Sequence, residues 1–167
     1  MPKTIAHPEI APPGRNGNST LFLDKEGRWF HEGVEITHLR TCVLFSKNLR
    51  RDATGRYAVR VGDESAEVVV EDAPYIVKSV TIQKGPAGLP NDYILHLNDG
   101  TQESLAPGAL TASGRNVLYC KVKGGSERAR FLRAAYYQIC VQLRCDEEGE
   151  RYWLPWRDKK IPIRLET

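Results

Sequence analysis

The stretch covering residues 28–77 constrains the fold more than any other, because it reads as one complete α+β unit. Residues 28–36 are aromatic-rich and broken by Gly33, which predicts a strand pair or a bent strand. A helix is predicted next, over residues 37–51, because apolar side chains recur there at helical spacing. Further strands are predicted over residues 57–61, 68–70 and 75–82.

Both ends of this predicted helix carry recognisable signals. Thr37 is expected to be the N-cap, because its hydroxyl can accept a hydrogen bond from a first-turn amide. Arg50 and Arg51 are expected in the last turn, where cations favour the negative end of the helix dipole. Residues 52–55 have the composition of a turn and end the helix.

A second helix is predicted over residues 126–144, with Ser126 as its cap. Residues 146–149 form an acidic turn, and residues 151–156 form an aromatic strand in which Pro155 predicts an edge or a bend. Between the two helices, the Asn98-Asp99-Gly100 turn and the strands on either side of it predict a hairpin.

Helix, acidic glycine turn and aromatic strand therefore occur twice. LRRDATGRY at residues 49–57 resembles LRCDEEGERY at residues 143–152, although turns of this kind also arise by chance. We predict an α+β fold of two repeated units of antiparallel β structure, each with one principal helix. The predicted divisions are an extended N-terminal arm at 1–20, a first unit at 21–82 and a second at 83–167, packed as one compact body.

Composition and charge narrow the class of protein. The 167 residues carry a net charge of +3, with basic segments at 25–61 and 119–167 around an acidic middle. Four cysteines lack metal-site spacing, and buried, reduced thiols are expected rather than disulfides or metal ligands. No signal peptide and no run of about 18 apolar residues is present, which predicts a cytoplasmic protein without membrane contact.

Four segments, in order, resemble one known family. They are DKEGRWFHEG at 24–33, LFSKNLRRDATGRY at 44–57, VEDAPY at 70–75 and ARFLRAAYYQI at 129–139. The series is similar to a bacterial family catalogued as domain of unknown function 1285. This resemblance implies an α+β fold with repeated structural motifs, no assigned enzymatic activity and a suggested part in signal transduction or ligand sensing. It implies no catalytic residue.

No motif in the sequence supports a catalytic or metal site. Glu71 and Asp72 are adjacent at a strand end, so their carboxylates point to opposite faces and do not form an acid–base pair. They can instead pair with an arginine such as Arg133. The histidines have no zinc-ligand spacing, and neither metal nor cofactor is expected.

A ligand site is nevertheless predicted, because arginine recognises anions in bidentate fashion and tyrosine offers a stacking wall. The alternative to a ligand site is that the aromatic side chains belong to the hydrophobic core and that the carboxylates form structural ion pairs. The predicted ligand-binding residues are Trp29, Glu71, Asp72, Arg133, Tyr136 and Tyr137.

The predicted function is a non-enzymatic ligand-binding or interaction module with a role in bacterial signal transduction. Its partner is predicted to be a small anionic or aromatic ligand, or a protein. The alternative is nucleic-acid binding through the basic helices 37–51 and 126–144, since lysine and arginine neutralise phosphate. The acidic middle segment argues against this alternative, because it can absorb that charge within the fold.

Overall fold

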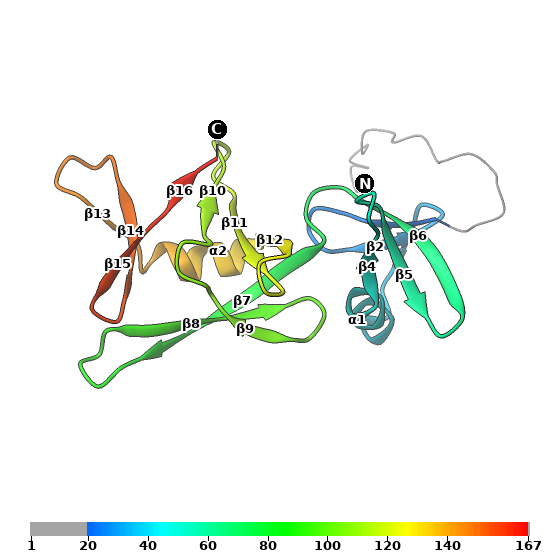
Figure 1. Cartoon of the computed structure of the whole chain (residues 1–167), viewed down its shortest axis with the longest axis horizontal. Helices are drawn as coiled ribbons and strands as arrows, with labels where there is room; N and C mark the ends of the chain where they lie inside the picture. The colour runs from blue at the N-terminus through cyan, green and yellow to red at the C-terminus, as the bar shows by residue number, and fades with distance from the viewer. Residues whose placement is uncertain (1–19, 167) are drawn as a thin grey trace, which may run out of the picture.

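The computed structural model describes residues 20–166, whose strands form two large sheets and one small sheet. Figure 1 shows the two large sheets side by side, each with one helix. The predicted α+β fold with two similar sheet units is confirmed. The predicted arm, apart from Thr20, lies outside the described residues.

The first sheet has six strands in the order β3-β2-β1-β6-β5-β4. Neighbouring strands are antiparallel except β1 and β6, which are parallel because the chain crosses over between them. The elements are β1 (Leu21–Leu23), β2 (Trp29–His31), β3 (Val34–Ile36), α1 (Leu39–Lys47), β4 (Leu49–Arg51), β5 (Tyr57–Val61) and β6 (Glu64–Val70).

Alternate residues of this sheet face α1 and form its core. Trp29 is buried there, packs edge-on against Phe45 of α1 and donates its indole N–H to Ser46 Oγ at 3.2 Å. Ser46 Oγ also accepts a 3.2 Å bond from Asn98 Nδ2 of the second unit. The core of the first unit is therefore tied directly to the second unit.

The second sheet has seven strands in the order β16-β10-β11-β12-β7-β8-β9, and a separate three-stranded sheet has the order β13-β14-β15. Within the seven-stranded sheet, the pairs β12–β7 and β10–β16 are parallel. The elements are β7 (Tyr75–Lys84), β8 (Pro90–Leu97), β9 (Gln102–Ser104), β10 (Thr111–Ala112), β11 (Leu118–Val122), β12 (Glu127–Phe131), α2 (Arg133–Cys140), β13 (Arg144–Cys145), β14 (Tyr152–Trp156), β15 (Lys159–Pro162) and β16 (Arg164–Leu165).

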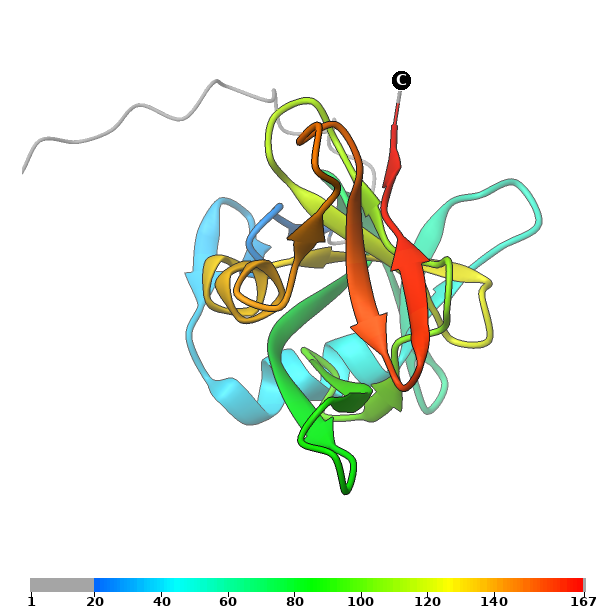
Figure 2. The ribbon, with the colours of Figure 1, turned by 90° about the vertical axis from the view of Figure 1, so that its left-hand side faces the viewer.

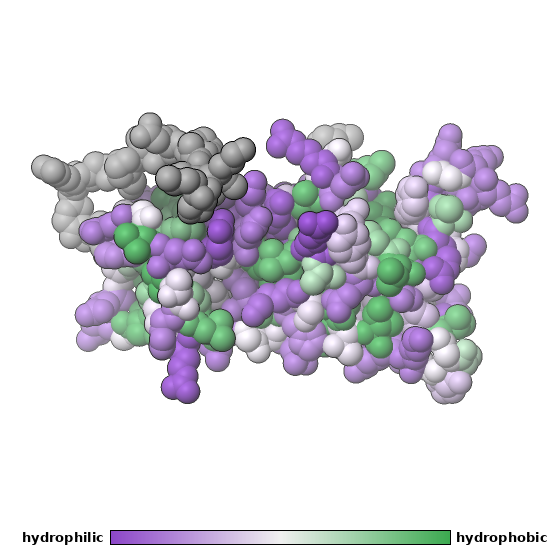
Figure 3. Space-filling view, turned by 180° about the vertical axis from the view of Figure 1, so that it is seen from behind, coloured by the Kyte–Doolittle hydropathy of each residue, from purple (hydrophilic) through white to green (hydrophobic). Residues whose placement is uncertain are grey.

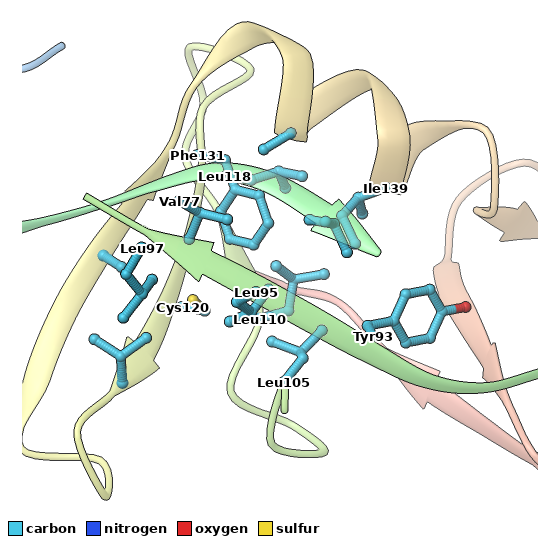
Figure 4. Packing of buried hydrophobic residues seen from close by; sticks show 14 of the residues in the cluster. Val77, Tyr93, Leu95, Leu97, Leu105, Leu110, Leu118, Cys120, Phe131 and Ile139 are labelled. Carbon is cyan, nitrogen blue, oxygen red and sulfur yellow. The ribbon is translucent and has the colours of Figure 1, made fainter. Parts of the chain in front are cut away.

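The larger hydrophobic core lies between the second sheet, α2 and the β14–β15 hairpin. Figure 2 views this arrangement from the β14–β15 end, and Figure 4 shows the packed side chains, among them Phe131 and Ile139. The buried Tyr93 donates its hydroxyl to the Pro155 carbonyl at 2.6 Å. That bond fastens the hairpin to β8. Among residues 20–166, neither helix has the length and apolar character needed to cross a membrane.

The structure corrects the predicted first helix. It spans Leu39–Lys47 rather than residues 37–51, and its N-cap is His38, without a side-chain cap, rather than Thr37. Arg50 and Arg51 belong to β4, because the backbone of residues 49–51 pairs with β5. Ladder hydrogen bonds to a neighbouring strand therefore replace the last helical turn.

The predicted second helix is also too long. Ser126 lies in a turn, and α2 covers only Arg133–Cys140 of the predicted range 126–144. Residues 127–131 form β12 instead, paired with β11 on one side and β7 on the other. The change from first to second sheet falls at residues 71–74, so the predicted boundary at 82/83 lies inside β7.

The repeated turn is present in both units. Asp52 and Asp146 each accept a bond from the glycine three residues later through the backbone carbonyl. Their carboxylates accept further backbone N–H groups, and hydrogen bonding from Thr54 lowers the pKa of Asp52 to about 2. A third turn of this kind begins at Asp24, whose carboxylate accepts the N–H groups of Glu26 and Arg28.

Candidate ligand site between the two sheet units

A pocket of about 350 Å³ lies where the first sheet meets the second. Its walls come from β4 and β5 on one side and from β10, β11, β12, β16 and adjoining loops on the other. The lining residues are Arg51, Tyr57, Gly108, Ala109, Thr111, Tyr119, Cys120, Lys121, Gly125, Ser126, Glu127, Arg128, Arg164 and Glu166.

Glu127 connects the two walls of this pocket. Its carboxylate accepts the Tyr57 hydroxyl at 2.9 Å and lies 3.3 Å from Arg51 Nε. Arg51 also donates to the Ser126 carbonyl at 2.8 Å. Burial, followed by the bond to Glu127, raises the pKa of Tyr57 to about 12, so its hydroxyl stays protonated as a donor at neutral pH.

The opposite wall is built around Tyr119. The Arg128 guanidinium stacks 3.7 Å from the centre of the Tyr119 ring and binds Glu166 at 2.7 Å. The Tyr119 hydroxyl donates to Asp72 at 2.8 Å, and Arg130 binds the same carboxylate oxygen at 2.7 Å. These contacts fix the orientation of Arg128, because its planar head is held on one face by the ring and at its edge by a carboxylate.

Positive charge exceeds negative charge around the pocket. Four cationic residues line it against the two carboxylates of Glu127 and Glu166. Within residues 20–166, the ion pairs of this pocket involve Arg51 and Arg128, while Lys121 and Arg164 have no carboxylate within 4 Å. Among the described residues, Lys121 and Arg164 are therefore the two pocket cations that an anion could neutralise without displacing an ion pair.

A second, open hollow of about 670 Å³ adjoins the pocket and shares Arg51 and Tyr57 with it. It lies over β4, β5 and β6, on the first sheet alone. Its other lining residues are Arg50, Asp52, Arg56, Ala58, Arg60, Ser65 and Glu67. Arginine side chains line both hollows.

The structure does not bring the predicted ligand-binding residues together. Trp29 is 1% exposed and lies in the core of the first sheet. Glu71 accepts the Lys25 backbone N–H at 2.8 Å, whereas Asp72 binds Tyr119 and Arg130 rather than Arg133.

The remaining predicted residues lie on α2. Arg133 lies over the Tyr137 ring at 5.7 Å from its centre, and Tyr137 is exposed. Tyr136 packs against the larger core, and the neighbouring Cys140 thiol, together with burial, raises the pKa of Tyr136. None of the three lines either hollow.

The four cysteines are free thiols, but not all are buried as the sequence predicted, since Cys42 and Cys140 are half-buried. Cys120 is buried, and burial raises its pKa to about 12, which leaves the thiol protonated and unreactive at neutral pH. Cys145 is exposed, in contrast to the other three. Residues 20–166 contain no group of three histidine, cysteine or acidic side chains arranged to hold a metal ion.

Sequence reasoning missed the residues that form the pocket. Arg51 was predicted only as a cation in the last turn of a helix, Arg128 only as part of a basic helix, and Tyr57 only as a strand residue. Arg164 carries no local signal at all. The pocket exists because parallel pairing of β16 with β10 brings the end of the described chain beside β11 and β12.

Comparison with known proteins agrees with this fold. Residues 9–73 match the family described as "Domain of unknown function (DUF1285), N-terminal domain". The resemblance predicted from the sequence motifs is therefore confirmed. No curated protein matches the chain.

Two solved structures are similar over most of the chain. A DUF1285 family protein from Silicibacter pomeroyi DSS-3 has a TM-score of 0.68 at 18% identity, covering 93% of this chain and 84% of that one. A DUF1285 family protein from Shewanella baltica OS155 has a TM-score of 0.57 at 19% identity, covering 74% of this chain and 91% of that one. At these identities the similarity shows the fold alone.

Proposed function

We propose that this chain, which carries the DUF1285 N-terminal domain, is a non-enzymatic module that binds a small anionic ligand between its two sheet units. The observation that supports this is the presence of Lys121 and Arg164 in the pocket without carboxylate partners among residues 20–166. An anion placed there would gain charge-assisted hydrogen bonds without displacing an existing ion pair.

The surrounding residues suit this role because they are already held in place. Arg128 is fixed by Tyr119 and Glu166, and Arg51 is fixed by Glu127 and Ser126. Preorganised groups lose little side-chain entropy on binding, which favours affinity. The rings of Tyr57 and Tyr119 in the walls can also accept an aromatic portion of the ligand by stacking.

A role in passing on the bound state follows from the position of the pocket. Its walls belong to both units, so a ligand that contacts both would stabilise one relative arrangement of them over others. A protein partner that recognises that arrangement would then respond to the ligand. This is the sense in which we propose a part in bacterial signal transduction.

The test is a thermal-shift screen of the full chain at low salt against phosphate, pyrophosphate, nucleotides and dicarboxylates. An anion at about 100 times its dissociation constant should stabilise the fold by about 2.7 kcal/mol. The variant Lys121→Gln/Arg164→Gln should lose that stabilisation. Arg115→Gln is the matched control, because Arg115 is exposed and outside both hollows.

Three results would contradict the proposal. One is silence across the panel, and another is equal stabilisation of wild type and Lys121→Gln/Arg164→Gln. The third is binding of DNA or RNA whose affinity falls steeply with salt and is unaffected by Lys121→Gln/Arg164→Gln. That last result would favour nucleic-acid binding. The binding surface would then be the strand arginines that line the open hollow, because the two helices are shorter than predicted.

A further inference from the structure

Part of the pocket between the two units is lined by the outer face of the second sheet. Cys120 of β11 pairs with Ala129 of β12, and both belong to the larger core, so the next residue along each strand points outward. Among these outward residues, Lys121 pairs directly with Arg128. Directly paired side chains lie on the same face, with Cβ atoms about 5 Å apart. Two cations therefore lie opposite each other beside the pocket.

A like-charged pair of this kind is unfavourable unless an anion lies between its members. The pocket carboxylates are already engaged elsewhere. Glu166 binds Arg128 through one oxygen at 2.7 Å and accepts the Thr111 hydroxyl through the other at 2.7 Å. Glu127 is likewise occupied by two donors from the first sheet. Within the described chain, Lys121 is therefore left without a counter-charge opposite Arg128.

A third cation reaches the same face from β16. Arg164 pairs with Thr111 of β10, which pairs on its other side with Tyr119 of β11. Lys121 is two residues beyond Tyr119, so it points to the same side of the sheet. The strands that carry Lys121 and Arg164 are two spacings apart, about 10 Å, so their long side chains can converge on one ligand group.

The charge of this space indicates the class of ligand. Four cationic residues and two carboxylates line the pocket, which leaves an excess of two positive charges. A phosphate monoester carries about 1.5 to 2 negative charges near pH 7, because its second pKa is about 6. A phosphate diester or a carboxylate carries one, and a dicarboxylate divides its two charges between separate groups. Arginine and lysine are also the side chains that bind phosphate oxygens most effectively.

Charge rather than apolar surface distinguishes this site. Figure 3 shows the back of the molecule, where hydrophobic residues form separate patches among hydrophilic ones. The pocket instead groups cations, and it meets the open hollow at Arg51 and Tyr57, which line both. The open hollow offers space for the remainder of a ligand whose charged group lies in the pocket.

We propose that the ligand of this pocket is a small phosphate monoester in its dianionic form. Its phosphate lies between Lys121 and Arg128, with Arg164 on a third side. The remainder of the molecule extends past Tyr57 towards the open hollow. This inference rests on the proposed function and names the chemical class of the anion.

Isothermal titration calorimetry of the full chain at low salt tests the assignment with methyl phosphate, dimethyl phosphate, malonate and sulfate. Near pH 7, methyl phosphate should bind about tenfold more tightly than dimethyl phosphate, because it offers a second charge to the same cations. It should also bind more tightly than malonate, whose two charges lie on separate carboxylates. Dimethyl phosphate further represents the diester backbone of nucleic acids.

The pH dependence of binding gives a second test. Lowering the pH from about 7 to about 5 should weaken methyl phosphate binding about tenfold, because its second pKa is about 6. Sulfate stays a dianion over this range and reports any titration of the protein itself. The ionisable groups that line the pocket within the described chain are arginine, lysine, tyrosine, cysteine and glutamate side chains, which ordinarily titrate outside this range.

Two single variants locate the site. Lys121→Gln and Arg164→Gln should each weaken methyl phosphate binding about tenfold, whereas Arg115→Gln should leave it unchanged. Both pocket residues are exposed, so their replacement leaves the core intact. If no probe binds, or if both variants bind as tightly as wild type, the proposed function fails together with this inference.

Other outcomes would overturn the phosphate assignment alone. One is binding of dimethyl phosphate or malonate as tight as that of methyl phosphate and weakened by Lys121→Gln. Another is an equal loss of methyl phosphate and sulfate affinity at acid pH. A phosphoserine peptide that binds more tightly than methyl phosphate would overturn the small-molecule source in favour of a phosphorylated protein.

Discussion

The Tyr57 hydroxyl donates a 2.9 Å hydrogen bond to the Glu127 carboxylate, although the two residues are 70 positions apart. Tyr57 lies on β5 of the first sheet and Glu127 on β12 of the second. Arg51 binds the same carboxylate, so a single acidic side chain receives two donors from the neighbouring unit. This contact is one of several that join the two units, and both of its residues line the candidate pocket.

Replacing Tyr57 by phenylalanine should weaken that junction while keeping the ring. The loss of one hydrogen bond to a charged acceptor should lower the free energy of unfolding by about 1.5 kcal/mol. Urea denaturation followed by circular dichroism measures it. Tyr152→Phe is the control, because Tyr152 is exposed and its hydroxyl has no partner among the described residues. Equal losses in the two variants would contradict a specific role for the Tyr57 hydroxyl.

Alkaline pH should destabilise the protein through the same residue. Burial and the bond to Glu127 raise the pKa of Tyr57 to about 12, against about 10 in an unfolded chain. Because folding favours the protonated hydroxyl, Tyr57 contributes its full stabilisation below pH about 10, and this contribution is lost as the pH rises towards 12. Melting temperatures measured across this range should fall less steeply for Tyr57→Phe than for wild type. Parallel curves would show that Tyr57 ionisation is not coupled to unfolding.

The ion pair between Lys123 and Asp99 should make the stability of the protein fall at acid pH. Burial alone raises the Asp99 pKa, but hydrogen bonds from Lys123 and Thr101 outweigh it and hold the pKa below its ordinary value. This stability is present above the unfolded pKa of about 4 and is lost as the pH falls through the folded pKa. Lys123→Met leaves a buried carboxylate unpaired and should cost about 3 kcal/mol at pH 7.

Denaturant titrations of Lys123→Met at neutral and acid pH measure this effect. The variant should lose less stability on acidification than wild type, because its Asp99 pKa is no longer depressed. Adding Asp99→Asn to Lys123→Met should recover part of the loss, since the uncompensated charge is then gone. A Lys123→Met protein as stable as wild type at pH 7 would refute the role of this pair.

Alanine substitutions at two glycines should distinguish the effect of backbone strain from that of steric overlap. Gly27 and Gly33 have similar positive φ values of 82° and 79°, but a Cβ at Gly27 would lie 2.8 Å from Ile76 Cγ1, whereas one at Gly33 would meet nothing within 4 Å. Both alanine variants should be destabilised by the φ value. Gly27→Ala should lose a further 1–3 kcal/mol approximately, from overpacking against β7. Comparable melting temperatures of the two variants would contradict the close approach.

Local sequence determined the elements whose signals are local. Alternating apolar residues identified β5, and helical spacing identified the existence of α1 and α2. The turn composition of residues 52–55 and 146–149 identified the turns at Asp52 and Asp146. These signals suffice because a strand's two faces, a helix's apolar stripe and a turn's side-chain bonds are all formed by residues close together in the chain.

Tertiary structure decided the rest. Residues 127–131 have a composition that also suits a helix, and they become a strand because β11 and β7 offer ladder hydrogen bonds on both edges. The pocket gathers Arg51, Lys121 and Arg164 from three distant parts of the chain. Sequence alone did not predict that meeting, because it depends on parallel pairing of β12 with β7 and of β16 with β10, which local spacing does not specify.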